Sequence, residues 1–456
     1  MLEGLPAAKD KDAKPPVTGT AKVFLNEKTG PPQHLASGFI YGIPDNPLQI
    51  PDHFYRDIHF RYTRAGGSQL PSNRGWARSV SDYEARFSSA LSNYRTARSH
   101  GGQFIYLISD LWGADGGQPK DALWPGDNDD WSHWDNLLTR WIADAQAHDH
   151  LDGLVFDIWN EPDLHFFWGR SVERWLRLWS RTYQRLRKEL PTLRLTGPSL
   201  SAFPSRDNQW WMGYLKHVSE TGEVPDQWAW HMESGKTEST MTNSVALFRE
   251  MLGEHGLSED AGRADINVNE YATYPEQLPS AGAWWIAQLE RQNAWGLRGN
   301  WAMGGALHDF MAGLLGKPGA GTDQYELEGT GYWPTAEYQV YLYYAREMVG
   351  GRVRTEPTEG AEELGDVYAT TDGKVVRVLA GTRARAGKWA VQISGWEKEG
   401  KVGVKTLAFS GDEKDHFMKF EAPEVLSERE VELNEGSLLL PVEHQDTTTA
   451  FAFEIT

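Results

Sequence analysis

The stretch LVFDIWNEPD, residues Leu154 to Asp163, carries the strongest single indication of the fold. It begins as a nearly continuous apolar run and ends abruptly in polar residues, as a buried strand of a parallel sheet does. A helical pattern follows, with apolar residues at offsets of three and four between Val172 and Leu190. A buried strand followed by an amphipathic helix predicts a βα unit.

The same alternation of short apolar runs and helical patterns recurs from Ala36 to Gly350 and yields eight candidate strands. Repeated βα units over this length predict a (β/α)8 barrel of the TIM type, which needs about 250 residues or more. The candidate strands are Phe39–Ile43, His59–Gly67, Phe104–Trp112, Leu154–Glu161, Leu193–Ser199, Trp228–Glu233, Ile266–Tyr271 and Asn300–Gly305.

The pattern changes after Gly351, where helical periodicity stops and short alternating runs take over. Asp372-Gly373 between two such runs is typical of a hairpin turn. These features predict a C-terminal antiparallel β-sandwich. The predicted divisions are a disordered lead (1–17), the barrel (18–350, of which 18–30 pair with the sandwich through KVFLN at Lys22–Asn26) and the sandwich domain (351–456).

Charge and composition exclude several classes of partner. The formal net charge of −19 disfavours nucleic acid and anionic membrane surfaces, since both attract clusters of Lys and Arg. No apolar run is long enough to predict a membrane span. The chain has no cysteine, so thiolate catalysis, disulfides and cysteine-based metal sites are excluded. Residues 1–16 lack the apolar core of a signal peptide, and both a secreted and a cytoplasmic mature protein stay open, as does the oligomeric state.

Tryptophan is unusually frequent, with 21 residues beside 17 Tyr and 17 Phe. One interpretation is simply a large core. The other is sugar binding, because flat aromatic faces match the apolar C–H faces of pyranose rings. Composition alone leaves both open.

The candidate chemistry begins at Glu161, which ends the fourth run within Trp159-Asn160-Glu161-Pro162-Asp163. Active sites of (β/α)8 barrels lie at the carboxyl ends of the strands, so Glu161 stands where a catalytic acid is expected. Asn160 beside it can hydrogen-bond a substrate hydroxyl. The alternative is that Glu161 only stabilises a helix start through the helix dipole.

A second carboxylate, Glu270, closes the seventh run within Asn269-Glu270-Tyr271. Strand ends three apart in an eight-stranded ring can face each other across the mouth. Glycoside hydrolysis with retention uses two carboxyl groups about 5–5.5 Å apart, one protonated and one ionised. We expect Glu161 to protonate the leaving oxygen and Glu270 to attack the anomeric carbon. The alternative is a salt-bridge network of unrelated acids.

Asn160-Glu161 on strand four and Glu270 on strand seven resemble the signature of glycoside hydrolase clan A. WNEPD followed by LHFFW (Leu164–Trp168), together with NEYAT (Asn269–Thr273), most resembles glycoside hydrolase family 39, the β-xylosidase and α-L-iduronidase family. The resemblance spans roughly residues 20–456. It implies a retaining glycosidase that takes a carbohydrate substrate and needs no cofactor or metal.

The resemblance implies roles for further positions. Arg64 corresponds to the family arginine near the nucleophile, and His231 to the histidine of strand six. Both could instead be structural, as a barrel-mouth salt bridge and a hydrogen-bonded core residue. Tyr271 is expected to shape the nucleophile's pocket. Trp301, ending strand eight, resembles the aromatic floor beneath the sugar, and Trp112 could line the same cavity; either could also be plain core.

The chain departs from the family at Arg64-Ala65-Gly66-Gly67, where xylosidases carry His-Gly. Gly66 replaces a sugar-contacting histidine, which predicts added space and one hydrogen bond fewer. A different glycone, or a disaccharide unit, is therefore an open alternative. From the family resemblance, the favoured function is an exo-acting retaining glycosidase for xylose- or arabinose-type glycones. An endo-acting glycanase of the same clan and a non-catalytic carbohydrate-binding barrel remain the alternatives.

Overall fold

The computed structural model describes residues 16–67, 70, 73–108, 111–113, 118–233, 240–257, 264–299, 301, 306–360, 362–397 and 399–456. Most of the expected lead, residues 1–15, lies outside these ranges. No helix in the described ranges is long and apolar enough to cross a membrane.

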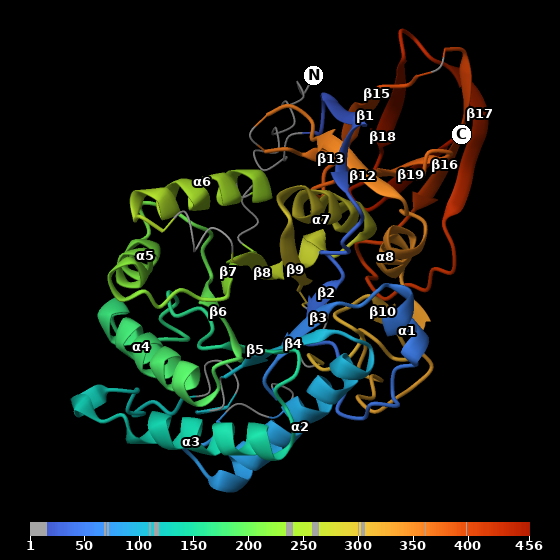
Figure 1. Cartoon of the computed structure of the whole chain (residues 1–456). Helices are drawn as coiled ribbons and strands as arrows, with labels where there is room; N and C mark the ends of the chain where they lie inside the picture. Colours follow the sequence, from blue (N-terminus) through green and yellow to red (C-terminus); the bar gives the residue numbers. More distant parts are fainter. Residues whose placement is uncertain are drawn as a thin grey trace, which may run out of the picture.

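A closed barrel of eight parallel strands forms the centre of the molecule, ringed by helices (Figure 1). Its strands pair in chain order, and β9 closes the ring by pairing with β2. The predicted (β/α)8 class is confirmed. The strands are β2 (Gly38–Ile40), β3 (Tyr62–Ala65), β4 (Gln103–Leu107), β5 (Leu154–Asp157), β6 (Arg194–Leu200), β7 (Gln227–Met232), β8 (Asp265–Tyr271) and β9 (Ala294–Arg298).

The helices cover the barrel because each carries an apolar face. On α4, Trp175, Leu178, Trp179 and Leu186 are buried at helical spacing, while the other face is rich in arginine. Pro191 follows the end of this helix, as the sequence predicts. The helices are α1 (Asp52–Asp57), α2 (Val80–Ser99), α3 (Ser132–Ala147), α4 (Val172–Glu189), α5 (Gln209–Thr221), α6 (Met241–Glu254), α7 (Pro279–Gln292) and α8 (Ala336–Arg346), with 3-10 turns η1 (Asp127–Asp129) and η3 (Tyr274–Glu276).

The eighth barrel strand lies earlier than the sequence pattern predicts. It is β9, Ala294–Arg298, whereas the run Asn300–Gly305 was expected; of that run only Trp301 is described, and it is not in a strand. β9 is hard to recognise because Gly296 interrupts its apolar pattern. A Cβ at Gly296 would lie 2.7 Å from the Tyr271 ring, so close packing against the neighbouring strand requires the glycine.

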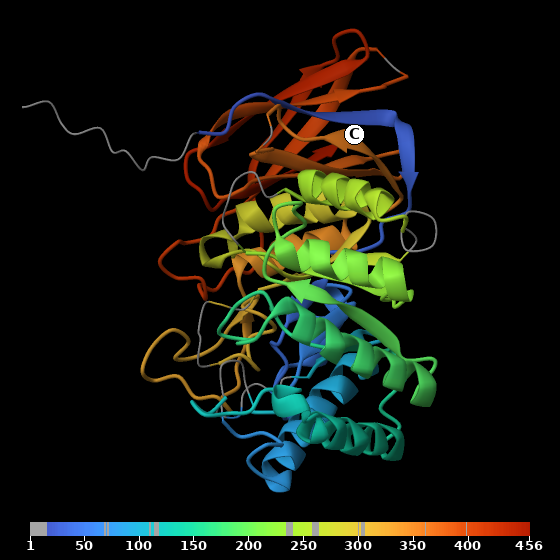
Figure 2. The ribbon, with the colours of Figure 1, turned by 90° about the vertical axis from the view of Figure 1, so that its left-hand side faces the viewer.

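A second, mostly antiparallel sheet of nine strands forms the other domain, seen above the barrel helices in Figure 2. β1 lies between β12 and β15, so the N-terminal segment belongs to this sheet. The expected C-terminal β-domain is confirmed. Its strands are β1 (Thr20–Gly30), β12 (Gly351–Glu356), β13 (Gly365–Thr371), β14 (Val376–Thr382), β15 (Gly387–Ser394), β16 (Lys401–Phe409), β17 (Glu424–Glu432), β18 (Ser437–His444) and β19 (Ala450–Ile455).

Helix α7 joins the two domains. Its residues are buried almost throughout, because one face packs on the barrel and the other on β13 and β14. Gln288 donates to Asp366, and Ser280 is 3.1 Å from the Thr382 hydroxyl. A short two-stranded ribbon, β10 (Leu315–Gly316) with β11 (Trp333–Pro334), lies in the connection between β9 and α8.

Candidate active site

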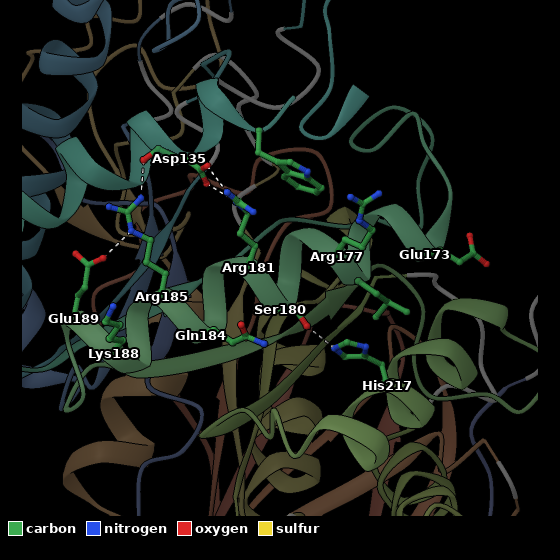
Figure 3. Close-up of a pocket in the computed structure, with 12 residues that line it drawn as sticks. Asp135, Glu173, Arg177, Ser180, Arg181, Gln184, Arg185, Lys188, Glu189 and His217 are labelled. Atoms are coloured by element: carbon green, nitrogen blue, oxygen red, sulfur yellow. Dashed lines mark hydrogen bonds and ion pairs between the residues drawn. The ribbon is translucent and has the colours of Figure 1, made fainter. Parts of the chain in front are cut away.

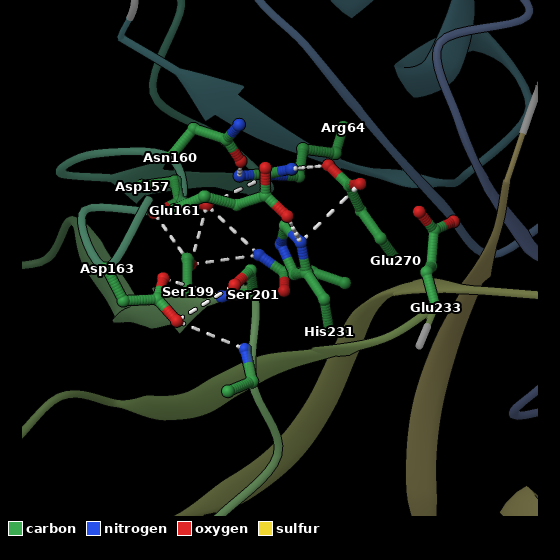
Figure 4. A network of polar contacts seen from close by, with 12 residues as sticks. Arg64, Asp157, Asn160, Glu161, Asp163, Ser199, Ser201, His231, Glu233 and Glu270 are labelled. Atoms are coloured by element: carbon green, nitrogen blue, oxygen red, sulfur yellow. Dashed lines mark hydrogen bonds and ion pairs between the residues drawn. The ribbon is translucent and has the colours of Figure 1, made fainter. Parts of the chain in front are cut away.

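The two glutamates chosen from the sequence meet at the carboxyl ends of the barrel strands (Figure 4). Glu161 lies in the loop after β5, Glu270 near the end of β8, and His231 in β7 between them. One ligand-type atom from each of these three side chains lies within 4.8 Å of the others. The ring of strands therefore brings together residues that are 109 positions apart in the chain.

Arg64 in β3 links three polar side chains of the site through its guanidinium group. Its guanidinium is fully buried and donates from Nη1 to Oε1 of Glu270 at 2.6 Å and from Nε to Asp157 at 2.9 Å. A third bond runs from Nη2 to Oδ1 of Asn160 at 2.7 Å. A fixed cation at this distance favours the ionised form of Glu270. Two interpretations of Arg64 were open from the sequence: a cation beside the nucleophile and a structural salt bridge at the barrel mouth. The observed geometry is compatible with both.

The third bond of Arg64 also orients Asn160. Because Oδ1 of Asn160 accepts from the guanidinium, the amide nitrogen is left to point away from it. Asn160 can thus donate to a hydroxyl of a bound substrate, as expected from its place beside Glu161.

A buried polar layer supports these groups. Asp157 accepts from Arg64, from the Ser199 hydroxyl at 2.9 Å and from the Asn269 amide at 3.1 Å. Burial raises the pKa of Asp157, while Arg64 and Ser199 act in the opposite direction. The layer fixes the arginine that in turn fixes the carboxylate of Glu270.

Glu161 has the environment of an acid that keeps its proton. Burial raises its pKa to about 7, with a further upward contribution from Asp163 and a downward one from Arg64. Asp163 stays in place because it accepts from Ser201 and from the backbone of Ala202. The backbone of Glu161 is left-handed, with φ of 42°, a conformation that is unfavourable for a side chain of this size and is found at functional sites.

His231 bridges the two glutamates. Its Nδ1 lies 2.8 Å from Oε1 of Glu161 and 3.5 Å from Oε2 of Glu270. Burial lowers its pKa, against the opposing effect of Glu270, so the ring is neutral near pH 7. A neutral imidazole with its proton on Nδ1 donates to these carboxyl groups without neutralising either one. His231 therefore lies at the site, beside the proposed nucleophile, as the family resemblance implied.

By spacing alone, Glu161, His231 and Glu270 could also hold a metal ion. Arg64, however, already supplies a positive charge 2.6 Å from Glu270. The arrangement suits a pair of carboxyl groups in different protonation states better than a set of metal ligands.

Two of the expected sugar-binding residues lie elsewhere. Tyr271 points away from the mouth: its ring packs on Trp285 of α7 and its hydroxyl lies 2.7 Å from that of Tyr341 in α8. The expectation that Tyr271 shapes the pocket is wrong because side chains alternate along a strand, and Glu270 takes the inward direction.

Trp112 belongs to an aromatic cluster rather than to the sugar cavity. Its ring packs edge-on against Trp124 at 4.6 Å and against Trp159 at 6.1 Å, and it is largely buried. Its place in this core agrees with the alternative interpretation, and one of its ring contacts is with Trp159, the neighbour of Asn160.

Trp301 does lie at the site, beside an acid that the sequence interpretation missed. Its indole Nε1 donates to Oε1 of Glu233 at 2.6 Å, and its backbone nitrogen donates to Gln277. Glu233 follows β7 two positions after His231, and the period of two along a strand could have indicated that both face the mouth.

The space beside Gly66, where a side chain would project, is occupied by the backbone of the neighbouring strand. A Cβ at Gly66 would collide with the carbonyl oxygen of Leu107 in β4. The expected added space is therefore occupied by the backbone of the adjacent strand, and no larger side chain fits here without a shift of the chain.

The cavity of about 830 Å³ in Figure 3 lies on the outer side of the barrel, between α3, α4 and α5. Basic residues of α4 line it, but Arg181 pairs with Asp135 and Arg185 with Glu189. It is a groove between surface helices and does not contain the glutamate pair.

Comparisons with known proteins show a family match for part of the chain and the same fold in solved structures. The model of Glycosyl hydrolases family 39 matches residues 120–262, which include β5 and Glu161. No curated protein matches the chain in sequence. Among solved structures, N2152 from Neocallimastix frontalis has a TM-score of 0.74 at 20% identity, covering 96% of this chain and 100% of that one.

Two further structures have the same fold at lower identity. A monomeric beta-xylosidase from Caulobacter crescentus CB15 has a TM-score of 0.58 at 14% identity, with 96% and 99% of the two chains covered. The GH39 enzyme from Xanthomonas axonopodis pv. citri has a TM-score of 0.58 at 12% identity, with 98% and 99% covered. The chain is a glycosidase whose central segment matches Glycosyl hydrolases family 39.

Proposed function

We propose that this glycosidase is a retaining, exo-acting enzyme that releases xylose- or arabinose-type glycones from oligosaccharides by double displacement. The observation that carries the proposal is the approach of the Glu161 and Glu270 carboxyl groups, with oxygen atoms within 4.8 Å of each other. Retaining glycosidases hold their two carboxyl groups about 5–5.5 Å apart, and inverting ones about 6.5–9.5 Å.

In the first step, Glu161 donates its proton to the glycosidic oxygen while Glu270 attacks the anomeric carbon. The bond from that carbon to the leaving oxygen breaks, and an ester bond to Glu270 forms. The environments support this division of roles: burial raises the pKa of Glu161 to about 7, whereas Arg64 lies 2.6 Å from Glu270 and favours its charged form.

In the second step, the now ionised Glu161 takes a proton from water, and the water oxygen attacks the same carbon. The ester bond breaks, the sugar leaves with its original anomeric configuration, and Glu270 is again a carboxylate. His231 contacts Glu161 at 2.8 Å and can hold this carboxyl group in place in both protonation states.

The exo action is supported by a fixed wall beside the mouth. The connection between β9 and α8 contains the buried ion pair of Lys317 with Asp309, 2.6 Å apart. Gln49, from the loop after β2, donates to the backbone of Leu327 in the same connection at 2.6 Å. A rigid wall favours a pocket that accepts chain ends over an open groove. The pentose preference follows from the family resemblance and from the beta-xylosidase of the same fold.

Proton NMR of the first-formed product tests the mechanism. We expect the released sugar to appear first with the anomeric configuration of the substrate and to mutarotate later. First appearance of the opposite anomer would overturn the retaining assignment. Product length from end-labelled oligosaccharides separates the two modes of action: single terminal sugars support exo action, and internal fragments contradict it.

A further inference from the structure

A third carboxyl group belongs to the mouth of the barrel. Glu233 lies two residues beyond His231, while the intervening Met232 is fully buried and its sulfur lies 3.7 Å from the Ser244 hydroxyl of α6. Since side chains alternate along a strand, His231 and Glu233 face inward. Figure 4 shows the carboxyl groups of Glu233 and Glu270 directed toward the same side of the ring of strands.

Packed and hydrogen-bonded neighbours hold Glu233 in one orientation. Oε1 accepts from the indole of Trp301 at 2.6 Å, and Gln277 holds the Trp301 backbone at 3.2 Å. A Cβ at Gly299 would collide with that indole nitrogen and lie 2.9 Å from Oε1 of Glu233. The close packing fixes one oxygen of the carboxyl group, and no hydrogen bond to the other is present among the described residues.

The ionisable groups that act most strongly on Glu233 are other carboxyl groups, those of Glu270, Glu161 and Glu276. Burial and the neighbouring Glu270 raise the pKa of Glu233 well above its ordinary value, and the Trp301 bond only partly offsets this. The cations buried near the strand ends are already paired within the described part of the chain. Arg64 binds Glu270 and Asp157, Arg298 binds Glu337, and Lys317 binds Asp309.

We propose that Glu233 is a specificity-determining residue of the glycone site, which hydrogen-bonds a sugar hydroxyl through its second oxygen, in a site that excludes glycones that carry a carboxylate. This inference rests on the proposed glycosidase mechanism and narrows its substrate class to uncharged sugars. A protonated carboxyl group can donate to a hydroxyl or accept from it, and an ionised one can accept. A substrate carboxylate would instead face the charged Glu270 with no unpaired cation among the described residues to receive it.

The test compares neutral glycosides with their carboxylate counterparts. Aryl xylosides, glucosides, arabinosides and galactosides are assayed first, and each accepted hexose or pentose is then paired with the glucuronide or galacturonide of the same ring configuration. The variants are Glu233→Gln, which keeps an oxygen for the Trp301 indole, and Glu233→Ala. The matched control is Glu424→Gln, an exposed acid of β17 in the other domain.

We expect the wild type to prefer the neutral glycoside by about a hundredfold or more, since a buried site rejects an unpaired charge. In Glu233→Gln, kcat/KM on the neutral glycoside should fall about tenfold, mainly through KM, because the hydrogen bond to the sugar hydroxyl is altered. The preference for the neutral glycoside should remain, because a glutamate that holds its proton carries no charge to remove. The control should match the wild type in both measurements. Thermal unfolding shows whether each variant is folded.

Two results would overturn the inference: a wild type that accepts the uronide as well as the neutral sugar, or a folded Glu233→Gln with unchanged KM on the neutral glycoside. Absence of wild-type activity on every neutral glycoside and every uronide would instead contradict the proposed function itself. The two failures are thus distinguishable.

Discussion

Nδ1 of His231 lies 2.8 Å from Oε1 of Glu161, so a side chain from β7 fixes one oxygen of the acid that follows β5. With Oε1 held in this way, the other oxygen of Glu161 is the one left to carry the proton toward a leaving group. The contact therefore links the geometry of the acid to the proton transfer it is proposed to perform.

Azide distinguishes the two glutamates. Glu161→Ala should lower turnover by about 10²–10⁴-fold because general acid catalysis is lost, and Glu270→Ala at least as much. Azide should restore part of the activity on aryl glycosides, since it fills the space of the missing carboxylate. It should give a glycosyl azide of retained configuration with Glu161→Ala and of inverted configuration with Glu270→Ala, as read by NMR. Equal turnover of Glu270→Ala and wild type would remove the proposed nucleophile.

The pH dependence of activity should follow the proton on Glu161. Because the acid must be protonated and its pKa is about 7, kcat/KM is expected to fall as pH rises through about 7. In Glu161→Gln, assayed with an aryl leaving group that needs no protonation, this alkaline decline should disappear. A decline that persists at the same pH in the variant would assign it to another group.

The same shift predicts an effect on stability. The pKa of Glu161 rises from 4.5 to about 7 on folding, so the folded state binds more protons and loses stability as pH increases between these values. The loss is on the order of 3 kcal/mol and is complete above the folded pKa. Glu161→Gln does not titrate, and its free energy of unfolding relative to wild type should therefore improve by about this amount from about pH 4 to about pH 8.

Urea unfolding at the two pH values measures this difference, with Glu424→Gln as an exposed control that should show little change. If the stability of Glu161→Gln relative to wild type does not change with pH, folding does not raise the pKa of Glu161.

Arg64→Lys tests whether the guanidinium fork matters beyond its charge. Lysine keeps the positive charge but cannot bond Glu270, Asp157 and Asn160 together, as Arg64 does. We expect kcat to fall by about a hundredfold or more, with a clear loss of thermal stability, because buried acids lose hydrogen bonds. Arg354→Lys, at a partly exposed ion pair with Glu27 in the other domain, is the control and should leave kcat unchanged. Near-normal kcat in a folded Arg64→Lys would mean that catalysis needs only the positive charge of Arg64 and not its hydrogen-bond geometry.

The sequence by itself determined the barrel, the second β-domain and the choice of Glu161 and Glu270. Local patterns were enough for this, because buried parallel strands read as apolar runs and catalytic acids of such barrels follow the carboxyl ends of strands. It placed the eighth strand too late because Gly296 breaks the apolar pattern of β9, where close packing requires a glycine.

Only the tertiary structure decided which side chains share the mouth. The alternation of side chains turned Tyr271 toward α7 and α8, and it brought Glu233 to the same side as His231. The three bonds of Arg64 and the contact of His231 with Glu161 join different strands of the ring. Such contacts depend on strand register and barrel closure, which arise from packing over the whole chain and leave no mark in any short stretch of sequence.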